Sequence, residues 1–259
     1  MILLFLACPA PPVEEVEELS CEAGPTLFGR PEAATGLSEA ECGPACSCGG
    51  ESWQAPEYTE ADIAALRAWV HAEPFEPLLE DPYESPAEPA PEAVCGVLTE
   101  ADGRYRLSSF EDQAALQAAG AALTHTGGCG LCSTLTDLAV YISVPDLTEP
   151  VRACGLEHLG SEPAELVACI EELGFTTPCA WIWAWNTLNT REHCLVECLA
   201  ALEEPYNQPD GSLNPCLQCD EDISGPVFKA VAGRTRRNTG LPNAICRPCE
   251  DVVPLEHHY

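Results

Sequence analysis

The sequence predicts a mainly α protein, in which a disulfide-rich helical domain with a loop-rich C-terminal segment follows an acidic, extended Pro/Ala/Glu-rich region. Three observations favour this fold class. The chain has 17 cysteines in 259 residues, its second part carries several capped helical segments, and its first part is crowded with prolines and carboxylates. We expect residues 1–8 to form a signal-like segment, residues 9–94 a tether, and residues 95–259 the helical domain.

The cysteine content indicates the compartment. A reducing cytosol does not usually maintain 17 thiols unless they bind metal or carry out redox work. We therefore expect an exported protein whose cysteines form disulfides. Because 17 is odd, at least one cysteine must lack an intramolecular partner.

The first eight residues resemble the end of a bacterial lipoprotein signal, a short apolar run followed by Cys8. On this interpretation Cys8 carries a lipid, the membrane is a partner, and the protein sits in the bacterial cell envelope. The segment lacks the basic start that a signal peptide normally has. The alternative is an ordinary signal fragment on a secreted protein, with Cys8 as a free or intermolecular thiol.

The net charge of −31 restricts the partners. Nucleic acid is a polyanion, so this chain is repelled by it, and we expect no nucleic-acid binding. The sequence also has no run of about eighteen apolar residues, so we expect no transmembrane helix.

The first part of the chain predicts a spacer. Residues 9–100 hold 20 Asp and Glu against two arginines, and six prolines fall between residues 74 and 91. Repeated proline favours an extended polyproline-like conformation. Within this part, Thr59 and Asp62 form a near capping box that predicts a helix over 59–72. A small cysteine knot is also expected, built from Cys21, Cys42, Cys46 and Cys48.

The second part predicts five helices joined by short connections, and neighbouring helices are therefore expected to pack antiparallel. Polar caps, early prolines and a late glycine place them over 108–123, 133–143, 161–174, 178–188 and 191–203. The stretch with Trp181, Trp183 and Trp185 is apolar all round, which is typical of a buried helix. From Glu204 onward, turn signals predict loops.

Cys129 and Cys132 form a CxxC pair just before a predicted helix. A helix N-terminus stabilises a thiolate, so thiol–disulfide exchange is one hypothesis. The preceding strand and βαβ pattern of a thioredoxin are missing, and a structural disulfide is the competing hypothesis. No other pattern indicates catalysis, so we expect no catalytic residues if the redox hypothesis fails.

Two further CxxC pairs offer four soft sulfurs, which suit a tetrahedral zinc site. They are Cys216, Cys219, Cys246 and Cys249. In an oxidising compartment the same residues would pair as disulfides, so we expect no cofactor and keep zinc as the alternative. Cys194 and Cys198 share one helix face, and Cys154, Cys169 and Cys179 are among the partners available to them nearby, although one sequence does not determine the connectivity.

Five of the chain's 11 basic residues lie between positions 229 and 247, namely Lys229, Arg234, Arg236, Arg237 and Arg247. Arginine forks match carboxylates and phosphates, so this segment is the candidate site for an anionic ligand or an acidic protein. The alternative is internal neutralisation by the nearby acids, which are Asp220, Glu221, Asp222, Glu250 and Asp251. The leading hypothesis is thus a non-enzymatic, surface-anchored binding or structural module.

Two blocks, 129–141 (CGLCS…DLAVY) and 216–237 (CLQCDED…GRTRR), resemble an uncharacterised group of secreted cysteine-rich proteins. The resemblance covers about residues 125–259. It implies secretion and disulfides, and it implies no activity, cofactor or site residue.

Overall fold

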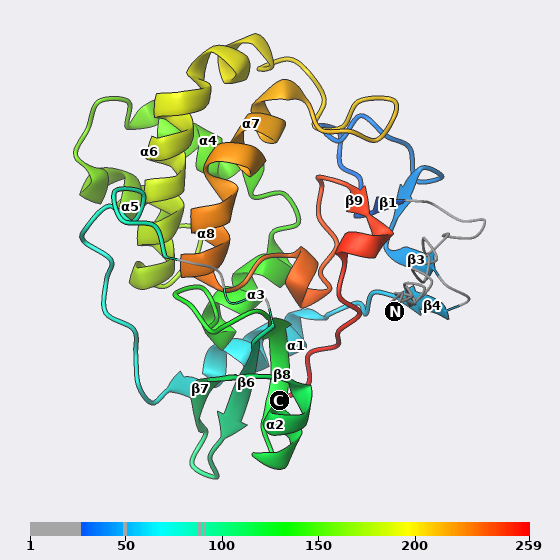
Figure 1. Cartoon of the computed structure of the whole chain (residues 1–259), viewed down its shortest axis with the longest axis vertical. Coiled ribbons are helices and arrows are strands. Elements are labelled where there is room, and N and C mark those ends of the chain that lie inside the picture. The colour runs from blue at the N-terminus through cyan, green and yellow to red at the C-terminus, as the bar shows by residue number, and fades with distance from the viewer. Residues whose placement is uncertain (1–26, 49–50, 88–89, 91) are drawn as a thin grey trace, which may run out of the picture.

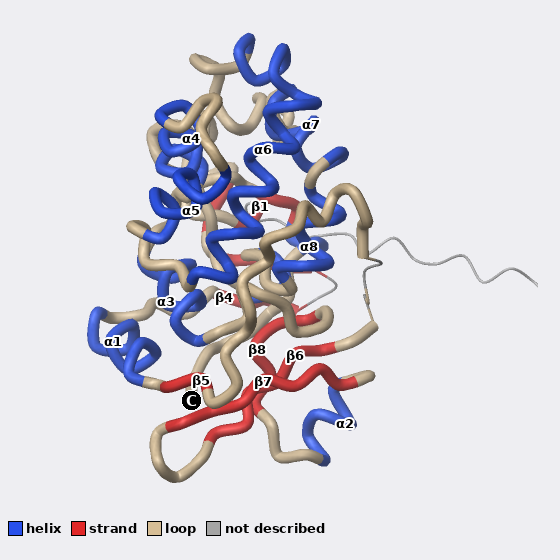
Figure 2. Tube along the Cα trace, turned by 90° about the vertical axis from the view of Figure 1, so that its left-hand side faces the viewer, coloured by secondary structure: helices blue, strands red, loops and turns tan. Residues whose placement is uncertain are grey.

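The computed structural model describes residues 27–48, 51–87, 90 and 92–259. A small sheet forms one end of the molecule, and most helices gather at the other end around the long helix α6 (Figures 1 and 2). The helices are α1 (Glu60–Ala68), α2 (Gln113–Ala118), α3 (Leu135–Ser143), α4 (Thr148–Glu157), α5 (Pro163–Glu171), α6 (Thr177–Ala200), α7 (Pro215–Ile223) and α8 (Gly225–Ala232), with single 3-10 turns at Arg237–Thr239 and Cys249–Asp251.

The sheet is the main departure from a mainly α fold, which is therefore correct only in part. Its strand order is β5–β7–β6–β8, from β5 (Val70–His71), β6 (Val94–Thr99), β7 (Arg104–Phe110) and β8 (Ala122–Thr126). The helix expected over 108–123 is wrong at both ends. Residues up to Phe110 extend β7, because Tyr105 and Leu107 alternate with polar residues, and Asp112 rather than Ser108 caps the short α2.

Other helical predictions agree better with the structure. Helix α3 lies within 133–143 and α5 within 161–174, with Pro163 in its first turn. The capping box of Thr59 and Asp62 is present at α1, although the helix ends at Ala68. The helices predicted over 178–188 and 191–203 are a single helix, α6, because no glycine or proline interrupts them.

The described residues before 87, which are 27–48 and 51–86, do not stand apart as a spacer. Strand β1 (Leu27–Phe28) pairs with β2 (Cys42–Gly43) and with the C-terminal β9 (Arg247–Pro248), while β3 (Ala45–Cys48) pairs with β4 (Glu51–Gln54). Disulfides join Cys42 to Cys246 and Cys46 to Cys249. The expected knot is therefore corrected for Cys42 and Cys46, while Cys8, Cys21 and the side chain of Cys48 lie outside what the structure describes.

The proline-rich segment has no helix or strand between residues 72 and 87, yet it is held against α6. The indole of Trp185 donates to the carbonyl oxygen of Leu78 at 2.9 Å. The Tyr83 hydroxyl donates to Asn186 Oδ1 at 3.0 Å and to the carbonyl oxygen of Ser224 at 3.1 Å. Proline removes the regular structure here, and side-chain hydrogen bonds fix the segment.

The core lies between the sheet and the helices, and Leu135, Leu138, Ile170 and Ile182 in it are fully buried. Trp181 and Trp185 share one face of α6, with ring centroids 5.8 Å apart. Trp183 points to the other face and packs on Phe228 at 4.9 Å. None of the helices in the described part of the chain combines the length and apolar character that a bilayer span requires.

Candidate functional site

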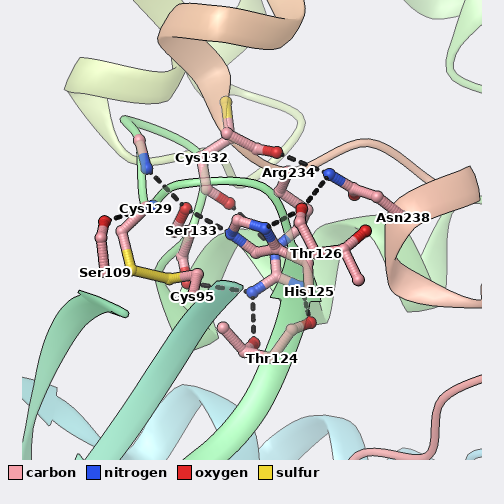
Figure 3. The surroundings of a disulfide bond; sticks show 12 residues. Cys95, Ser109, Thr124, His125, Thr126, Cys129, Cys132, Ser133, Arg234 and Asn238 are labelled. Carbon is pink, nitrogen blue, oxygen red and sulfur yellow. Dashed lines mark hydrogen bonds between the residues drawn. A yellow bond between two sulfur atoms is a disulfide. The ribbon is translucent and has the colours of Figure 1, made fainter. Parts of the chain in front are cut away.

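Arg234 lies inside the protein (Figure 3) and not at a surface. Its guanidinium donates to the carbonyl oxygens of Cys132 at 3.0 Å, Ser133 at 2.9 Å and Thr124 at 3.2 Å, and to the Thr124 hydroxyl at 2.7 Å. Because main-chain acceptors use these donors, the predicted contact between Arg234 and an external anion is corrected. Arg234 joins β8 to the start of α3.

Arg236 is also used internally. It donates to the carbonyl oxygen of Tyr141 at 2.6 Å and to that of Val144, and it lies 5.5 Å from the centre of the Tyr141 ring. Burial lowers the pKa of Arg236 to about 10, so the group is still charged at neutral pH. Its guanidinium therefore binds carbonyl oxygens at the end of α3 and in the loop after it. This corrects the prediction that Arg236 is free to contact a ligand.

Lys229, Arg237 and Arg247 surround one carboxylate, Glu221, and we call these four residues the Glu221 cluster. The nitrogen–oxygen distances to Glu221 are 2.8 Å from Lys229, 2.8 Å from Arg237 and 2.6 Å from Arg247. Burial alone would raise the pKa of Glu221, but the three cations outweigh burial and lower the pKa to about 2. The cluster thus holds an internal anion and keeps an excess of positive charge.

Replacing Glu221 with glutamine is expected to cost about 3 kcal/mol of unfolding free energy at neutral pH. The pKa of Glu221 is lowered from its ordinary 4.5 to about 2, so its contribution is present above pH 4.5 and is lost as the pH falls to 2. Denaturant unfolding of both proteins across this range should show the difference shrinking at acid pH. A constant difference would contradict the prediction, and Glu165→Gln, at a side chain 62% exposed, is the control.

A serine–histidine pair lies beside Arg234 (Figure 3). The Nδ1 of His125 lies 2.9 Å from the Thr126 carbonyl oxygen, which can only accept, so Nε2 accepts from the Ser133 hydroxyl at 2.7 Å. Burial lowers the pKa of His125 well below its usual range. Both side chains are fully buried, and Ser133 also accepts from the Gly130 N–H at 2.8 Å. The pair has no route to a substrate and fixes the turn before α3.

None of the three CxxC pairs closes on itself. Cys129 bonds to Cys95, and Cys132 bonds to Cys179, which removes the exchangeable pair that the redox hypothesis requires. The four cysteines of the zinc alternative bond outward instead, in the pairs Cys198–Cys216, Cys194–Cys219, Cys42–Cys246 and Cys46–Cys249. The partners expected for Cys194 and Cys198 are corrected by the same pairs.

A different group of possible metal ligands includes a cysteine that is already in a disulfide. Glu157, His158 and Cys169 lie within reach of one ion. Cys169 is bonded to Cys154, so its sulfur is not the thiolate that binds zinc. The group therefore carries no metal site in the oxidised protein.

A cleft of about 310 Å³ runs along α6, and we call it the α6 cleft. Its lining residues come from α3, α4, α6, α7 and α8, from Phe28 and from residues 235–252. Its lining is mostly apolar side chains. A volume of this size is at the lower end of the range for small-molecule sites, and apolar walls with a few polar groups are typical of them.

The lining of the α6 cleft has a charge opposite to that of the chain. Among the described residues, two acids line it, Asp220 and Glu221. Six of the chain's 11 basic residues line it, namely Arg152, Arg191, Lys229, Arg236, Arg237 and Arg247. In a chain with a net charge of −31, this concentration makes the cleft attractive to anions.

Three polar atoms in the cleft lining have no hydrogen-bond partner among the described residues. They are the Tyr141 hydroxyl, the Trp183 indole Nε1 and one terminal nitrogen of Arg191, all three buried. The Trp183 indole lies close enough to the Tyr141 hydroxyl to lower its pKa, so these two groups are each other's polar neighbours and Arg191 is the clearest unpaired donor. A buried donor without a partner costs about 1–3 kcal/mol, and a water, an ion or a ligand can each supply the missing acceptor.

The outer part of the cleft carries exposed leucines, which we call the leucine rim. Its members are Leu156, Leu159, Leu195, Leu199 and Leu202, each between 44% and 63% exposed. Isolated exposed leucines are ordinary, but a contiguous apolar rim beside a cleft is typical of a binding surface.

Sequence reasoning names four of the six basic residues of the cleft, Lys229, Arg236, Arg237 and Arg247, as candidate ligand contacts. It misses Arg152, Arg191 and Tyr141. Arg191 is a lone arginine in a long helix, eight residues after Trp183, and Tyr141 belongs to an ordinary apolar helix. The sequence feature that could have indicated Arg191 is the scarcity of basic residues, since the chain has only 11 of them against 42 acids.

Residues 163–255 match the model of a family of unknown function (DUF8771). The match confirms the resemblance to an uncharacterised group of proteins. It runs from α5 to the second 3-10 turn, and it includes five of the six basic residues of the cleft, all but Arg152. The curated proteins yield no match to the chain, and neither do the solved structures.

Proposed function

We propose that the protein is an extracytoplasmic binding module that holds an amphipathic anion in the α6 cleft. The observation that carries the proposal is the joint occurrence of apolar walls and six basic residues in one cleft of an acidic chain. Apolar walls favour an apolar ligand body by about 25 cal/mol for each Å² that is buried. The excess of cations selects a negative group on the same molecule.

The disulfides support a place outside the cytoplasm. Seven disulfides join described cysteines, and such bonds persist in oxidising compartments. We propose that the protein is exported and attached to the bacterial cell envelope through a lipid on Cys8, or else secreted. The intact mass of the protein from its host tests the anchor, since a diacylated Cys8 adds the mass of its lipid.

The redox and zinc alternatives lack a supporting observation. Both require free or locally paired sulfurs in the CxxC motifs, and the cysteines bond to distant partners. The binding module remains the function that the geometry supports best.

A fluorescence titration with 1-anilinonaphthalene-8-sulfonate tests the proposal, because this dye is itself an amphipathic anion. We expect saturable binding to the full chain, weakened about twofold by Arg152→Gln, because Arg152 lines the cleft but shares its charge with Glu149. Arg104→Gln is the matched control, since Arg104 pairs with Glu100 and Asp102 on the sheet, away from the cleft. No saturable binding, or equal loss in both variants, would overturn the proposed function.

A further inference from the structure

The unpaired donors divide the α6 cleft into a polar inner half and an apolar outer half. Trp183 and Arg191 are eight residues apart on α6, which corresponds to about 12 Å along the helix. The Tyr141 hydroxyl lies at the inner end, close to the Trp183 indole. Leu195 and Leu199 continue along α6 on the outer side of Arg191. A ligand that fits both halves carries its oxygen atoms inward and its hydrocarbon outward.

Arg191 is suited to bind the charged group of such a ligand. Its side chain is partly buried in the cleft lining, and it has no ion pair or hydrogen bond to any described residue. Arg152, on the facing wall, is paired with Glu149 at 2.9 Å. A guanidinium without a carboxylate partner in an apolar cleft is stabilised by an anion from outside, and its planar fork accommodates a carboxylate or a phosphate.

The leucine rim is suited to cover one hydrocarbon chain. From Arg191 to Leu199, α6 rises about 12 Å, and Leu202 extends the rim beyond Leu199. One acyl chain spans half of a hydrocarbon core of roughly 30 Å, or about 15 Å, so the rim covers most of one such chain when its head group lies at Arg191. A volume of about 310 Å³ suits one chain better than two.

We propose that the ligand is an anionic single-chain lipid, with its charged head group at Arg191 and its tail against the leucine rim. This inference rests on the proposed function and names the ligand class. A phosphate head group also has oxygen atoms that extend inward from Arg191, toward Tyr141 and Trp183. The shared chemistry is a fatty-acid carboxylate or the phosphate of a monoacyl phospholipid.

Displacement of the bound dye separates these two sources. We expect palmitate or 1-palmitoyl lysophosphatidate, or both, to displace the dye below their micellar concentrations. Monopalmitoylglycerol has the tail without the charge, and glycerol 3-phosphate has the charge without the tail, so neither should displace it at the same concentration. Dye binding without displacement by either anionic lipid would overturn the inference and leave the proposed function standing. Absence of dye binding would remove both.

Two substitutions distinguish ligand contact from a structural role. Arg191→Met and Tyr141→Phe remove unpaired donors while keeping most of each side chain. We expect each to weaken the anionic lipid at least about threefold, and Arg191→Met about tenfold or more, while the melting temperature of the ligand-free protein stays unchanged or rises. Lower thermal stability with unchanged lipid binding would show a structural role and overturn the assignment.

The direction of the tail is tested by Leu199→Glu. Leu199 is 54% exposed, so the substitution does not disturb the core. It places a negative charge beside the tail, and we expect a loss of lipid binding of about tenfold or more. Ile223→Glu is the matched control, because Ile223 is 48% exposed and does not line the cleft. Equal lipid binding by the two variants would contradict a tail at the rim.

Discussion

Replacing Arg234 with lysine is expected to lower the free energy of unfolding by about 3–5 kcal/mol, which is a large share of the stability of most domains. Arg234 is fully buried and makes its strongest bonds to the carbonyl oxygens of Cys132 and Ser133 and to Thr124. Lysine has one ammonium in place of the planar fork, so it cannot satisfy these acceptors together. Two or more carbonyl groups are then left buried without donors.

Denaturant unfolding under oxidising conditions measures this loss. Arg104→Lys is the control, because Arg104 is 52% exposed and its ion pairs are at the surface. The control is expected to change stability by less than about 1 kcal/mol. If Arg234→Lys were as stable as the control, Arg234 would not hold the start of α3. Its internal hydrogen bonds would then no longer explain why it does not contact a ligand.

Loss of the two disulfides that join the N-terminal segment to the C-terminal segment is expected to cost about 4–5 kcal/mol. Cys42–Cys246 and Cys46–Cys249 close parallel loops, so either bond alone keeps most of the constraint. All four cysteines must therefore be replaced with serine. The loop that these two disulfides close contains the Cys95–Cys129, Cys132–Cys179 and Cys194–Cys219 disulfides, which act as shortcuts. The shortest covalent path around the loop is therefore roughly 100 residues, and the cost is calculated for that length.

The Cys154–Cys169 pair is the matched comparison, since it closes a loop of only 15 residues. Its double serine variant is expected to lose about 3 kcal/mol. Limited proteolysis should also cut residues 27–48 faster in the quadruple variant alone, because only that variant loses their covalent link to β9. Equal losses of stability and equal proteolysis in the two variants would contradict the role of this link.

Local patterns in the sequence predict local structure well. The Thr59–Asp62 capping box, the helix after Ser133 and the helix that begins at Pro163 depend on neighbouring residues, and all three are present. The sheet depends on pairing between distant strands, as in Val94 opposite Phe110 and Thr126. A single sequence gives no direct sign of such pairing, so the prediction of a helix over 108–123 is wrong.

The candidate site shows the same division. The spacing of Lys229, Arg237 and Arg247 indicates a basic group, and Glu221 is one of the five nearby acids that the sequence offers to neutralise it. Burial decides which arginines can contact a ligand. Arg234 is fully buried, and its spacing from the other basic residues does not reveal this. The unpaired donors of the α6 cleft are identified by the absence of a neighbour, which only the folded chain displays.

The central claim is that the α6 cleft is one site for an amphipathic anion, built from apolar walls and most of the basic residues of an acidic chain. The stoichiometry of the dye titration tests it most directly, with the neutral dye N-phenyl-1-naphthylamine titrated beside the anionic one. The account predicts one saturable site per chain that prefers the anionic dye. Several weak sites, or equal affinity for the neutral dye, would contradict it.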